Sequence, residues 1–103
     1  MGVRTANVHE GNIGETLTGL AAVIHGRREA SPEESYTARL LVGEEDSLLK
    51  KLAEESSEII MACKDRDHIR YEMGDLVYHL MVVMERYDIS LGELAGELDA
   101  RRH

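Results

Sequence analysis

Apolar residues recur at helical spacing in five stretches of the chain, and residues that favour turns separate these stretches. The first stretch follows Asn12, a good N-cap residue, and its apolar positions run from Ile13 to about His25. A loop is expected over residues 26–35. No periodicity precedes this helix, so the pattern predicts a flexible arm over residues 1–11 and a single helical domain over residues 12–103.

Helix start and stop signals follow in the middle of the chain. Ser31 is followed by a proline and two glutamates, and this pattern predicts the start of a helix. Gly43 predicts the end of that short helix. Asp46 or Ser47 is then expected to cap a long acidic helix that runs to about Cys63. A second long helix is predicted from near Asp67 to Tyr87, and a last one begins at the capping box Ser90-Leu91-Gly92-Glu93.

The second long helix has an unusually large apolar surface. Its core-facing stripe is predicted to consist of Ile69, Met73, Leu76, Leu80 and Val83. From Leu76 to Met84 the helix is apolar almost all round, apart from His79, which favours cover by a second subunit. The pattern therefore predicts an all-α fold of about five helices, with a four-helix-bundle-like core that homo-oligomerisation completes.

Each long helix also carries acidic residues on or beside its apolar stripe. The first contains Glu55-x-x-Glu58 and the second contains Glu72-x-x-Asp75, with thirteen residues between the two pairs. An ionised carboxylate among core positions is costly unless it is paired or binds a metal. On an antiparallel helix pair the four acids can face one another and hold a hard cation. Carboxylate ligands favour Mg²⁺, with Mn²⁺ also possible, over zinc or copper.

A cation held in this way points to phosphate chemistry, because Mg²⁺ characteristically completes its shell with water and phosphate oxygens. Candidate phosphate contacts are Lys50, Lys51 and Arg39, and Lys51 is best placed because it lies one turn before Glu55. Glu54 is rotated outward beside the expected ligands and is the candidate general base.

Simpler interpretations of the same residues stay open. The acids and Lys51 can form a solvated helix face with i, i+4 pairs. His79 can be a hydrogen-bonded core histidine, and Tyr78 can be interface packing as well as a contact to a base. On this interpretation the chain is a non-catalytic helical dimerisation module without metal dependence.

Composition and charge narrow the class of protein. A chain of 103 residues suits one domain, and 43% hydrophobic residues without Phe or Trp suit a core of packed helices. A net charge of -8 argues against a nucleic-acid partner. The single cysteine, the lack of a signal-peptide pattern and the absence of an apolar run of roughly 18–20 residues favour a cytoplasmic protein without a membrane partner.

The acidic motif resembles the metal signature of the all-α, MazG-like NTP pyrophosphohydrolases. Three segments resemble the phosphoribosyl-ATP pyrophosphohydrolases of histidine biosynthesis within that superfamily, and these are Ser35 to Leu40, Lys50 to Glu55 and Glu72 to Leu80. The resemblance covers roughly Leu17 to Leu98. Gly74 stands where that family leads us to expect alanine, a change that loosens the helix without removing a ligand.

The resemblance implies a hydrolase that cleaves between the α and β phosphates of N1-(5-phosphoribosyl)-ATP, with Mg²⁺, to give phosphoribosyl-AMP and pyrophosphate. It also implies a helical homo-oligomer with sites near subunit boundaries. By position, it implies Glu55, Glu58, Glu72 and Asp75 as metal ligands and Lys51 as a phosphate contact. Tyr78 and His79 join the candidate substrate-binding residues. The alternative within the superfamily is a house-cleaning enzyme that acts on ordinary or damaged NTPs or dNTPs.

Overall fold

The computed structural model describes residues 8–62 and 64–102, and in this part of the chain it contains five α-helices, a short 3₁₀ helix and no strand. The helices are α1 (Ile13–Gly26), η1 (Arg27–Glu29), α2 (Tyr36–Val42), α3 (Glu45–Met61), α4 (Arg66–Arg86) and α5 (Leu91–Ala100). The all-α prediction of about five helices is confirmed. Residues 1–7 of the expected arm, and Cys63, lie outside the described residues.

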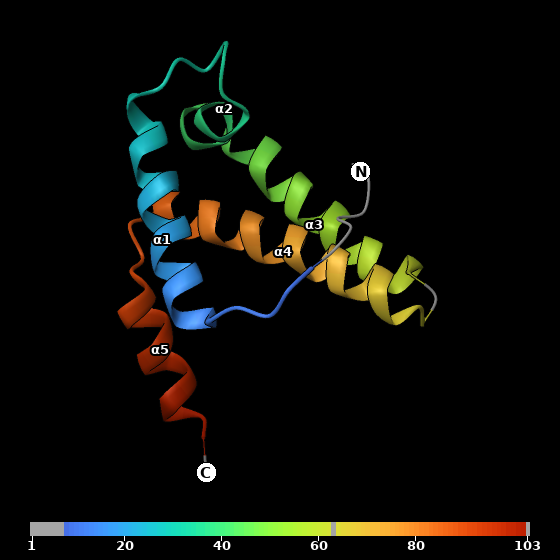
Figure 1. The fold of residues 1–103 in the computed structure, drawn as a ribbon. Coiled ribbons are helices and arrows are strands. Elements are labelled where there is room, and N and C mark those ends of the chain that lie inside the picture. Colours follow the sequence, from blue (N-terminus) through green and yellow to red (C-terminus); the bar gives the residue numbers. More distant parts are fainter. Residues whose placement is uncertain (1–7, 63, 103) are drawn as a thin grey trace.

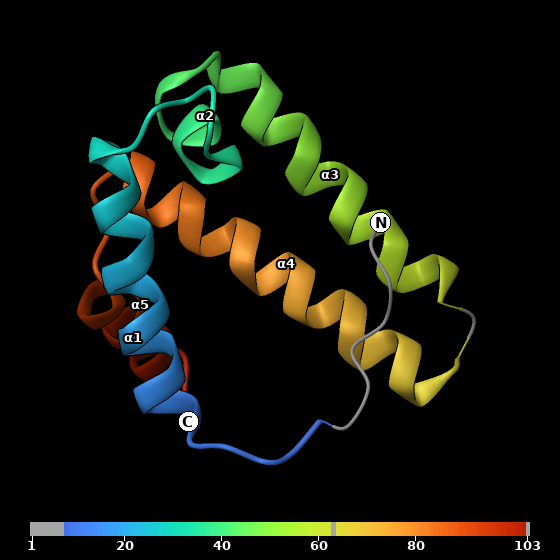
Figure 2. The ribbon, with the colours of Figure 1, turned by 45° about the horizontal axis from the view of Figure 1, so that its top comes forward.

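The long helix α4 is the element on which the others are arranged (Figure 1). Helices α3 and α4 run antiparallel side by side, and α1 crosses α4 near the C-terminal end of α4 (Figure 2). The short helix α2 packs on α4 and also contacts α3 and η1. Helix α5 extends away from this end of α4 and has no buried residue.

The hydrophobic core lies where α1, α2, α3 and the C-terminal half of α4 meet. Its buried members are Ile24, Leu40, Leu41, Leu48, Met81 and Val82. Burial of side chains of this size stabilises the fold by roughly 1.5–3 kcal/mol each. Among the described residues, no helix combines the length and the apolar character that a membrane crossing requires.

Side-chain caps at both ends of the chain agree with the sequence pattern. Asn12 accepts a hydrogen bond from the Glu15 amide at 2.9 Å, so α1 begins where predicted. Ser90 and Glu93 form the reciprocal capping box, with distances of 2.9 and 3.0 Å. Both short polar motifs act locally, which is why the sequence alone predicts them well.

The predicted helix start at Ser31 is wrong. Ser31 accepts bonds from the amides of Glu34 and Ser35 and so closes one turn, but Ser35 then adopts an extended backbone and ends it. The Ser35 side chain accepts from the Ala38 amide at 3.1 Å and caps α2 instead. Two serines four residues apart can each cap, and the buried contacts of α2 favour the second.

The predicted cap of the long acidic helix is also wrong, because α3 begins at Glu45, one or two residues before Asp46 and Ser47. Gly43 ends α2 as expected, with its amide bonded to Arg39 O. A Cβ added to Gly43 would lie 2.5 Å from that oxygen, so only glycine fits this tight connection. The acidic first turn of α3 interacts favourably with the helix dipole without a side-chain cap.

The predicted core-facing stripe of α4 is wrong at Met73 and Leu80, while Val83 packs on the core as predicted. Met73 and Leu80 are 52% and 41% exposed, whereas Glu72, His79 and Val82 are buried. Glu72 lies close to Glu55 of α3, and His79 is bonded to Tyr36 of α2. Tertiary contacts with polar side chains thus override the apolar periodicity of this helix.

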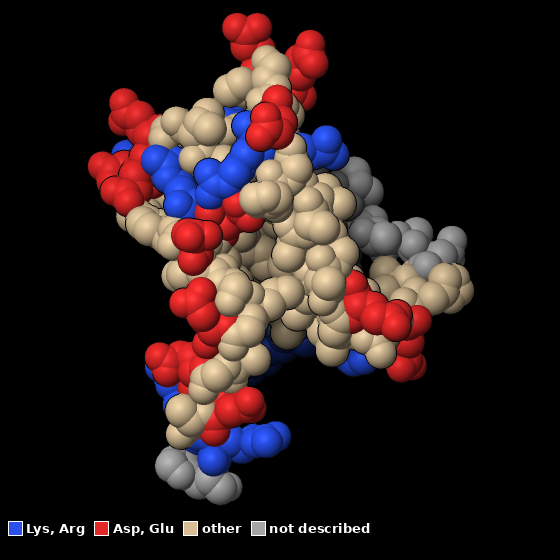
Figure 3. Space-filling model, turned by 90° about the vertical axis from the view of Figure 1, so that its left-hand side faces the viewer, with Lys and Arg blue, Asp and Glu red and all other residues tan. Residues whose placement is uncertain are grey.

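Charges of both signs meet on the surface. On the face shown in Figure 3, Lys and Arg side chains gather in the upper part, with Asp and Glu side chains around them. The 3₁₀ helix places Arg27 and Arg28 at the end of α1, and Arg28 binds the Glu85 side chain and its backbone oxygen. This face is therefore not the uniformly basic surface that nucleic-acid binding uses.

Candidate metal centre

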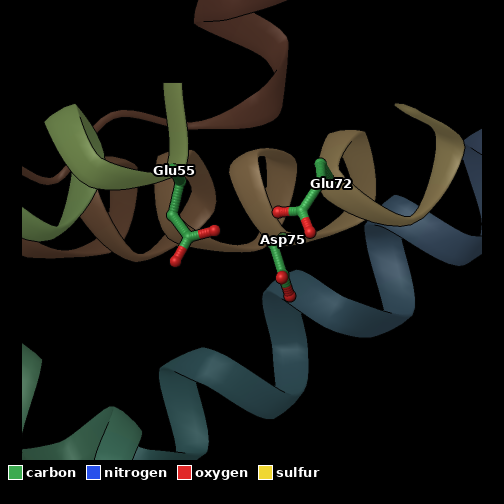
Figure 4. A group of neighbouring side chains, drawn as sticks. All are labelled: Glu55, Glu72 and Asp75. Carbon is green, nitrogen blue, oxygen red and sulfur yellow. The ribbon is translucent and has the colours of Figure 1, made fainter. Parts of the chain in front are cut away.

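The antiparallel pair α3 and α4 brings three carboxylates together (Figure 4). Glu55 of α3 and Glu72 and Asp75 of α4 each offer one oxygen, and these oxygens all lie within 4.8 Å of one another. At the start of α4, the Asp65 amide bonds to Ala62 O at 3.1 Å, and the Asp65 side chain caps the helix.

Two of these carboxylates are buried, and several oxygens of the group form no hydrogen bond with the described part of the chain. Glu55 is 0% and Glu72 is 2% exposed. Both oxygens of Glu55, and one each of Glu72 and Asp75, find no hydrogen-bond partner among the described residues. Buried carboxylates this close together repel one another, and the nearby Lys51 offsets only part of that cost. A divalent cation held by one oxygen from each of the three residues would remove that repulsion, so this group of residues fits a metal ion.

One basic side chain stands a turn before each buried glutamate. Lys51 Nζ lies 3.3 Å from Glu55 Oε1, and His68 Nε2 lies 3.3 Å from Glu72 Oε1. Burial lowers the pKa of Lys51, but the carboxylates of Glu55 and Glu54 more than offset this, so its pKa is raised above 10.5. Lys51 therefore stays charged at neutral pH and faces the metal centre.

The other two predicted acids stand outside the group of three. Glu58 lies on α3, one turn after Glu55, and is half-buried. The Glu54 side chain is 65% exposed, and its carboxylate lies 3.6 Å from Lys51 Nζ. Both acids border the site, and neither belongs to the group whose oxygens lie within 4.8 Å.

The remaining predicted basic residues are exposed. Lys50 lies on α3 beside Lys51. Arg39 donates to Pro32 O at 3.0 Å, and its guanidinium carbon lies 5.7 Å from the centre of the Tyr36 ring. Arg39 and Tyr36 also line a hollow of about 390 Å³ between α2 and the start of α3. Arg39 thus lines a hollow beside α2, and Lys50 is exposed on α3.

Tyr78 and His79 of α4 are hydrogen-bonded to side chains of α2. The Tyr36 hydroxyl lies 3.0 Å from His79 Nε2, and Thr37 Oγ1 is hydrogen-bonded to the Tyr78 hydroxyl. His79 Nδ1 lies 2.8 Å from the backbone oxygen of Asp75. His79 is 3% exposed, so both its ring nitrogens are used within the protein. The open interpretation of a hydrogen-bonded core histidine describes this geometry.

Two residues at the site were not predicted as such. His68 lies four residues before Glu72, as Lys51 lies four before Glu55, and this repeated i, i+4 spacing is the signal that could have found it. Tyr36 gave no such signal, because its partner His79 is 43 residues away. Only the packing of α2 on α4 brings the two together.

A second cavity, of about 520 Å³, lies elsewhere, between α1, the end of α4 and the start of α5. Its lining includes His25 and Glu85, which lie 3.0 Å apart, and several apolar side chains. Arg28 binds the same carboxylate, and although burial raises the pKa of Glu85, Arg28 and His25 hold it below 4.5. None of the predicted site residues lines this cavity.

Known proteins resemble this chain along most of its length. The family model described as phosphoribosyl-ATP pyrophosphohydrolase matches residues 17–102. The phosphoribosyl-ATP pyrophosphatase of Nitrosomonas eutropha is 46% identical over 87 residues, which cover 82% of this chain and 74% of that protein. The phosphoribosyl-ATP pyrophosphatase of Variovorax paradoxus is 43% identical over 99 residues, covering 87% and 79%.

A longer relative shares the same region. The histidine biosynthesis bifunctional protein HisIE of Synechocystis sp. is 43% identical over 90 residues, which cover 85% of this chain and 42% of that protein. The described acids and their neighbours all fall inside the matched region, residues 17–102. This chain belongs to the phosphoribosyl-ATP pyrophosphohydrolase family.

Proposed function

We propose that this protein is a hydrolase of histidine biosynthesis that cleaves N1-(5-phosphoribosyl)-ATP between its α and β phosphates. Water adds across that anhydride bond, and the products are phosphoribosyl-AMP and pyrophosphate. The observation that carries the proposal is the group of Glu55, Glu72 and Asp75, which brings one oxygen of each residue within 4.8 Å of the others in a largely buried place. Membership in the phosphoribosyl-ATP pyrophosphohydrolase family supports the choice of substrate.

The three carboxylates would hold Mg²⁺, with Mn²⁺ as a substitute, because hard divalent cations prefer oxygen ligands. When bound, such a cation lowers the pKa of a water molecule and neutralises charge on phosphate oxygens. Glu58, half-buried one turn after Glu55, completes the proposed ligand set. Every one of these acids lies on a helix, which gives the site a rigid frame.

The remaining site residues bind and orient the substrate in this proposal. Lys51, charged and 3.3 Å from Glu55, faces the same space as the acids and would contact a phosphate oxygen. The exposed Lys50 and Arg39 would attract the polyphosphate. Glu54, largely exposed beside Lys51, is placed to accept a proton from the attacking water.

We also propose that the active form is a homo-oligomer. Met73, Val77 and Leu80 stand at helical spacing on the outer side of α4 and are exposed. Leu94 and Leu98 of α5 add further exposed apolar surface. Apolar side chains that a single chain leaves uncovered on neighbouring helices favour contact with a second copy.

The direct test is to incubate the protein with phosphoribosyl-ATP, ATP, dCTP and dUTP in Mg²⁺ and to identify the products. The proposal predicts the highest kcat/KM for phosphoribosyl-ATP, with release of pyrophosphate. Preference for dCTP or dUTP would instead support a house-cleaning enzyme. Release of orthophosphate, or no metal-dependent turnover, would contradict the proposed reaction.

A further inference from the structure

The hollow between α2 and the start of α3 has no role in the proposed metal site. Its volume of about 390 Å³ falls within the roughly 300–1,000 Å³ of small-molecule sites. Pro32, Leu40 and Val42 contribute to its lining, and among the described lining residues Arg39 is the one basic side chain and Glu44 the one acidic side chain. A largely apolar lining with a single cation suits a ligand that carries one anionic group on an uncharged body.

A chain of hydrogen bonds links this hollow to the metal centre. Tyr36 lines the hollow, and its hydroxyl lies 3.0 Å from His79 Nε2. His79 Nδ1 lies 2.8 Å from the backbone oxygen of Asp75, one of the three acids. Two hydrogen bonds therefore separate a lining residue of the hollow from a residue of the metal centre.

Helix α3 connects the same two places. Ser47, Lys51 and Glu55 follow one another at intervals of four residues and so lie along one side of the helix. Ser47 lines the hollow, and Lys51 Nζ is 3.3 Å from Glu55 Oε1. The eight residues from Ser47 to Glu55 span about 12 Å along the helix axis. An extended ligand can thus reach from the metal centre, past Lys51, into the hollow.

Arg39 is held in one position at this hollow. Its Nη1 donates to Pro32 O at 3.0 Å, and its guanidinium carbon lies 5.7 Å from the centre of the Tyr36 ring. A guanidinium has five N–H donors in a planar fork that matches a phosphate group, and a side chain that is already held loses less entropy on binding. Because Arg39 lies over the Tyr36 ring, that face of the ring is not available for stacking with a purine.

We infer that this hollow receives the second ribose phosphate of the substrate and that Arg39 binds its phosphate group. The inference rests on the proposed function, since phosphoribosyl-ATP differs from ATP only in this group, which lies at the far end of the molecule from the triphosphate. The sugar meets the apolar lining, and the phosphate meets the one cation. Arg39 is then a residue that determines specificity for phosphoribosyl-ATP over ATP.

The test compares the affinities of phosphoribosyl-AMP and AMP, measured by calorimetry in Mg²⁺, which needs no turnover. The wild type should bind phosphoribosyl-AMP more tightly. Arg39→Gln keeps a donor for Pro32 O, and it should weaken phosphoribosyl-AMP binding about tenfold or more while AMP affinity stays within about twofold. Arg101→Gln removes the same charge from an exposed position just after α5 and should leave both affinities unchanged.

A second variant fills the hollow and keeps the charge of Arg39. Ser47→Leu adds apolar bulk to the lining and should also weaken phosphoribosyl-AMP selectively. Ser57→Leu, at an exposed position of α3 outside the lining, is its control and should leave both affinities unchanged. In turnover, Arg39→Gln should lower kcat/KM for phosphoribosyl-ATP about tenfold and leave that for ATP unchanged.

The outcomes separate this inference from the proposed function. If the wild type does not release pyrophosphate from phosphoribosyl-ATP, the proposed function fails. If the wild type is active but Arg39→Gln keeps the full difference in affinity between phosphoribosyl-AMP and AMP, the inference is wrong. Equal weakening of both nucleotides would also overturn it, because Arg39 would then contact a part that they share. Circular dichroism of each variant establishes that the helices are retained.

Discussion

The two sides of helix α4 reverse the usual arrangement of a surface helix. The inner side buries an acid and a histidine, Glu72 and His79, while the outer side exposes Met73 and Leu80. A helix in a stable monomer ordinarily places apolar side chains inside and polar ones outside. The inner side of α4 is thus consistent with the proposed binding site, and the outer side with the proposed association of two copies.

This contrast has an energetic consequence. Three carboxylates within 4.8 Å lower the stability of the isolated fold, since like charges repel and the ion pair of Glu55 with Lys51 offsets only part of that repulsion. Binding of a cation would remove that penalty and link metal binding to stability. The outer side costs little in the monomer and would add stability in the proposed oligomer, where a second copy would cover it.

The largest expected effect comes from the inner side. Glu55→Gln should lower turnover at least about 100-fold, because the loss of a ligand exceeds the 10- to 100-fold cost typical of its supporting groups. In the absence of metal the same variant should be more thermally stable than wild type, since we expect the relief of repulsion from Glu72 and Asp75 to exceed the loss of the ion pair with Lys51. Metal-dependent kinetics and thermal unfolding measure the two effects. Glu54→Gln is the control for the change in charge, and its unfolding temperature should not move.

The next effect concerns the basic residue beside Glu55. Lys51→Ala should raise the KM for phosphoribosyl-ATP about tenfold or more, whereas Lys50→Ala, at an exposed neighbouring position, should change it by less than about threefold. A folded pKa above 10.5 means that the ion pair with Glu55 stabilises the fold below that pH and is lost as the pH rises through the folded pKa. The ratio of the two variants' KM values should thus be the same at pH 7 and pH 9. A ratio near one at either pH would argue against a phosphate contact by Lys51.

The apolar outer side of α4 can be disrupted without changing the acidic residues of the inner side. Leu80→Glu should weaken self-association about 30-fold, the cost of a central interface residue, while the isolated helices stay folded. Sedimentation velocity over a range of concentrations measures the change. Leu49→Glu, at 43% exposure on α3 compared with 41% for Leu80, is the matched control. A wild-type protein that sediments as a monomer at all concentrations would refute the proposed oligomer.

The smallest effect is expected at Glu85, at the C-terminal end of α4 and away from the acidic site. Arg28 and His25 hold its pKa below 4.5 despite burial, so their interaction stabilises the fold above that pH and is lost as the pH falls through the folded pKa. Glu85→Gln should destabilise the protein by about 1 kcal/mol at pH 7 and by less at pH 3. Urea unfolding at the two pH values tests this, and equal losses at both would exclude the ionic contribution.

Local motifs explain how far the sequence alone could predict the fold. Asn12, Gly43 and the Ser90 capping box act through bonds within a few residues, and the structure confirms each of them. The predicted helix start at Ser31 was wrong because Ser35 offers an equally good N-cap four residues later. Choosing between them requires the contacts of α2 with α4, which no local pattern contains.

The candidate site likewise contains residues that the sequence could predict and contacts that it could not. Glu55, Glu72 and Asp75 could be predicted because their spacing on two helices is a regular signal, and the structure brings them together. The orientation of α4 could not be predicted. Its apolar residues form a more regular stripe than the residues that face α3. The partnership of Tyr36 with His79 depends on a contact between distant helices and was invisible to any periodicity.

The central claim is that Glu55, Glu72 and Asp75 form one metal site. The most direct test is a titration of Mn²⁺ into the protein without substrate, followed by electron paramagnetic resonance, with wild type, Glu55→Gln and Glu54→Gln side by side. The claim predicts saturable binding to the wild type and to Glu54→Gln, and affinity at least about tenfold weaker for Glu55→Gln. Equal affinity in all three proteins, or no saturable binding to the wild type, would contradict it.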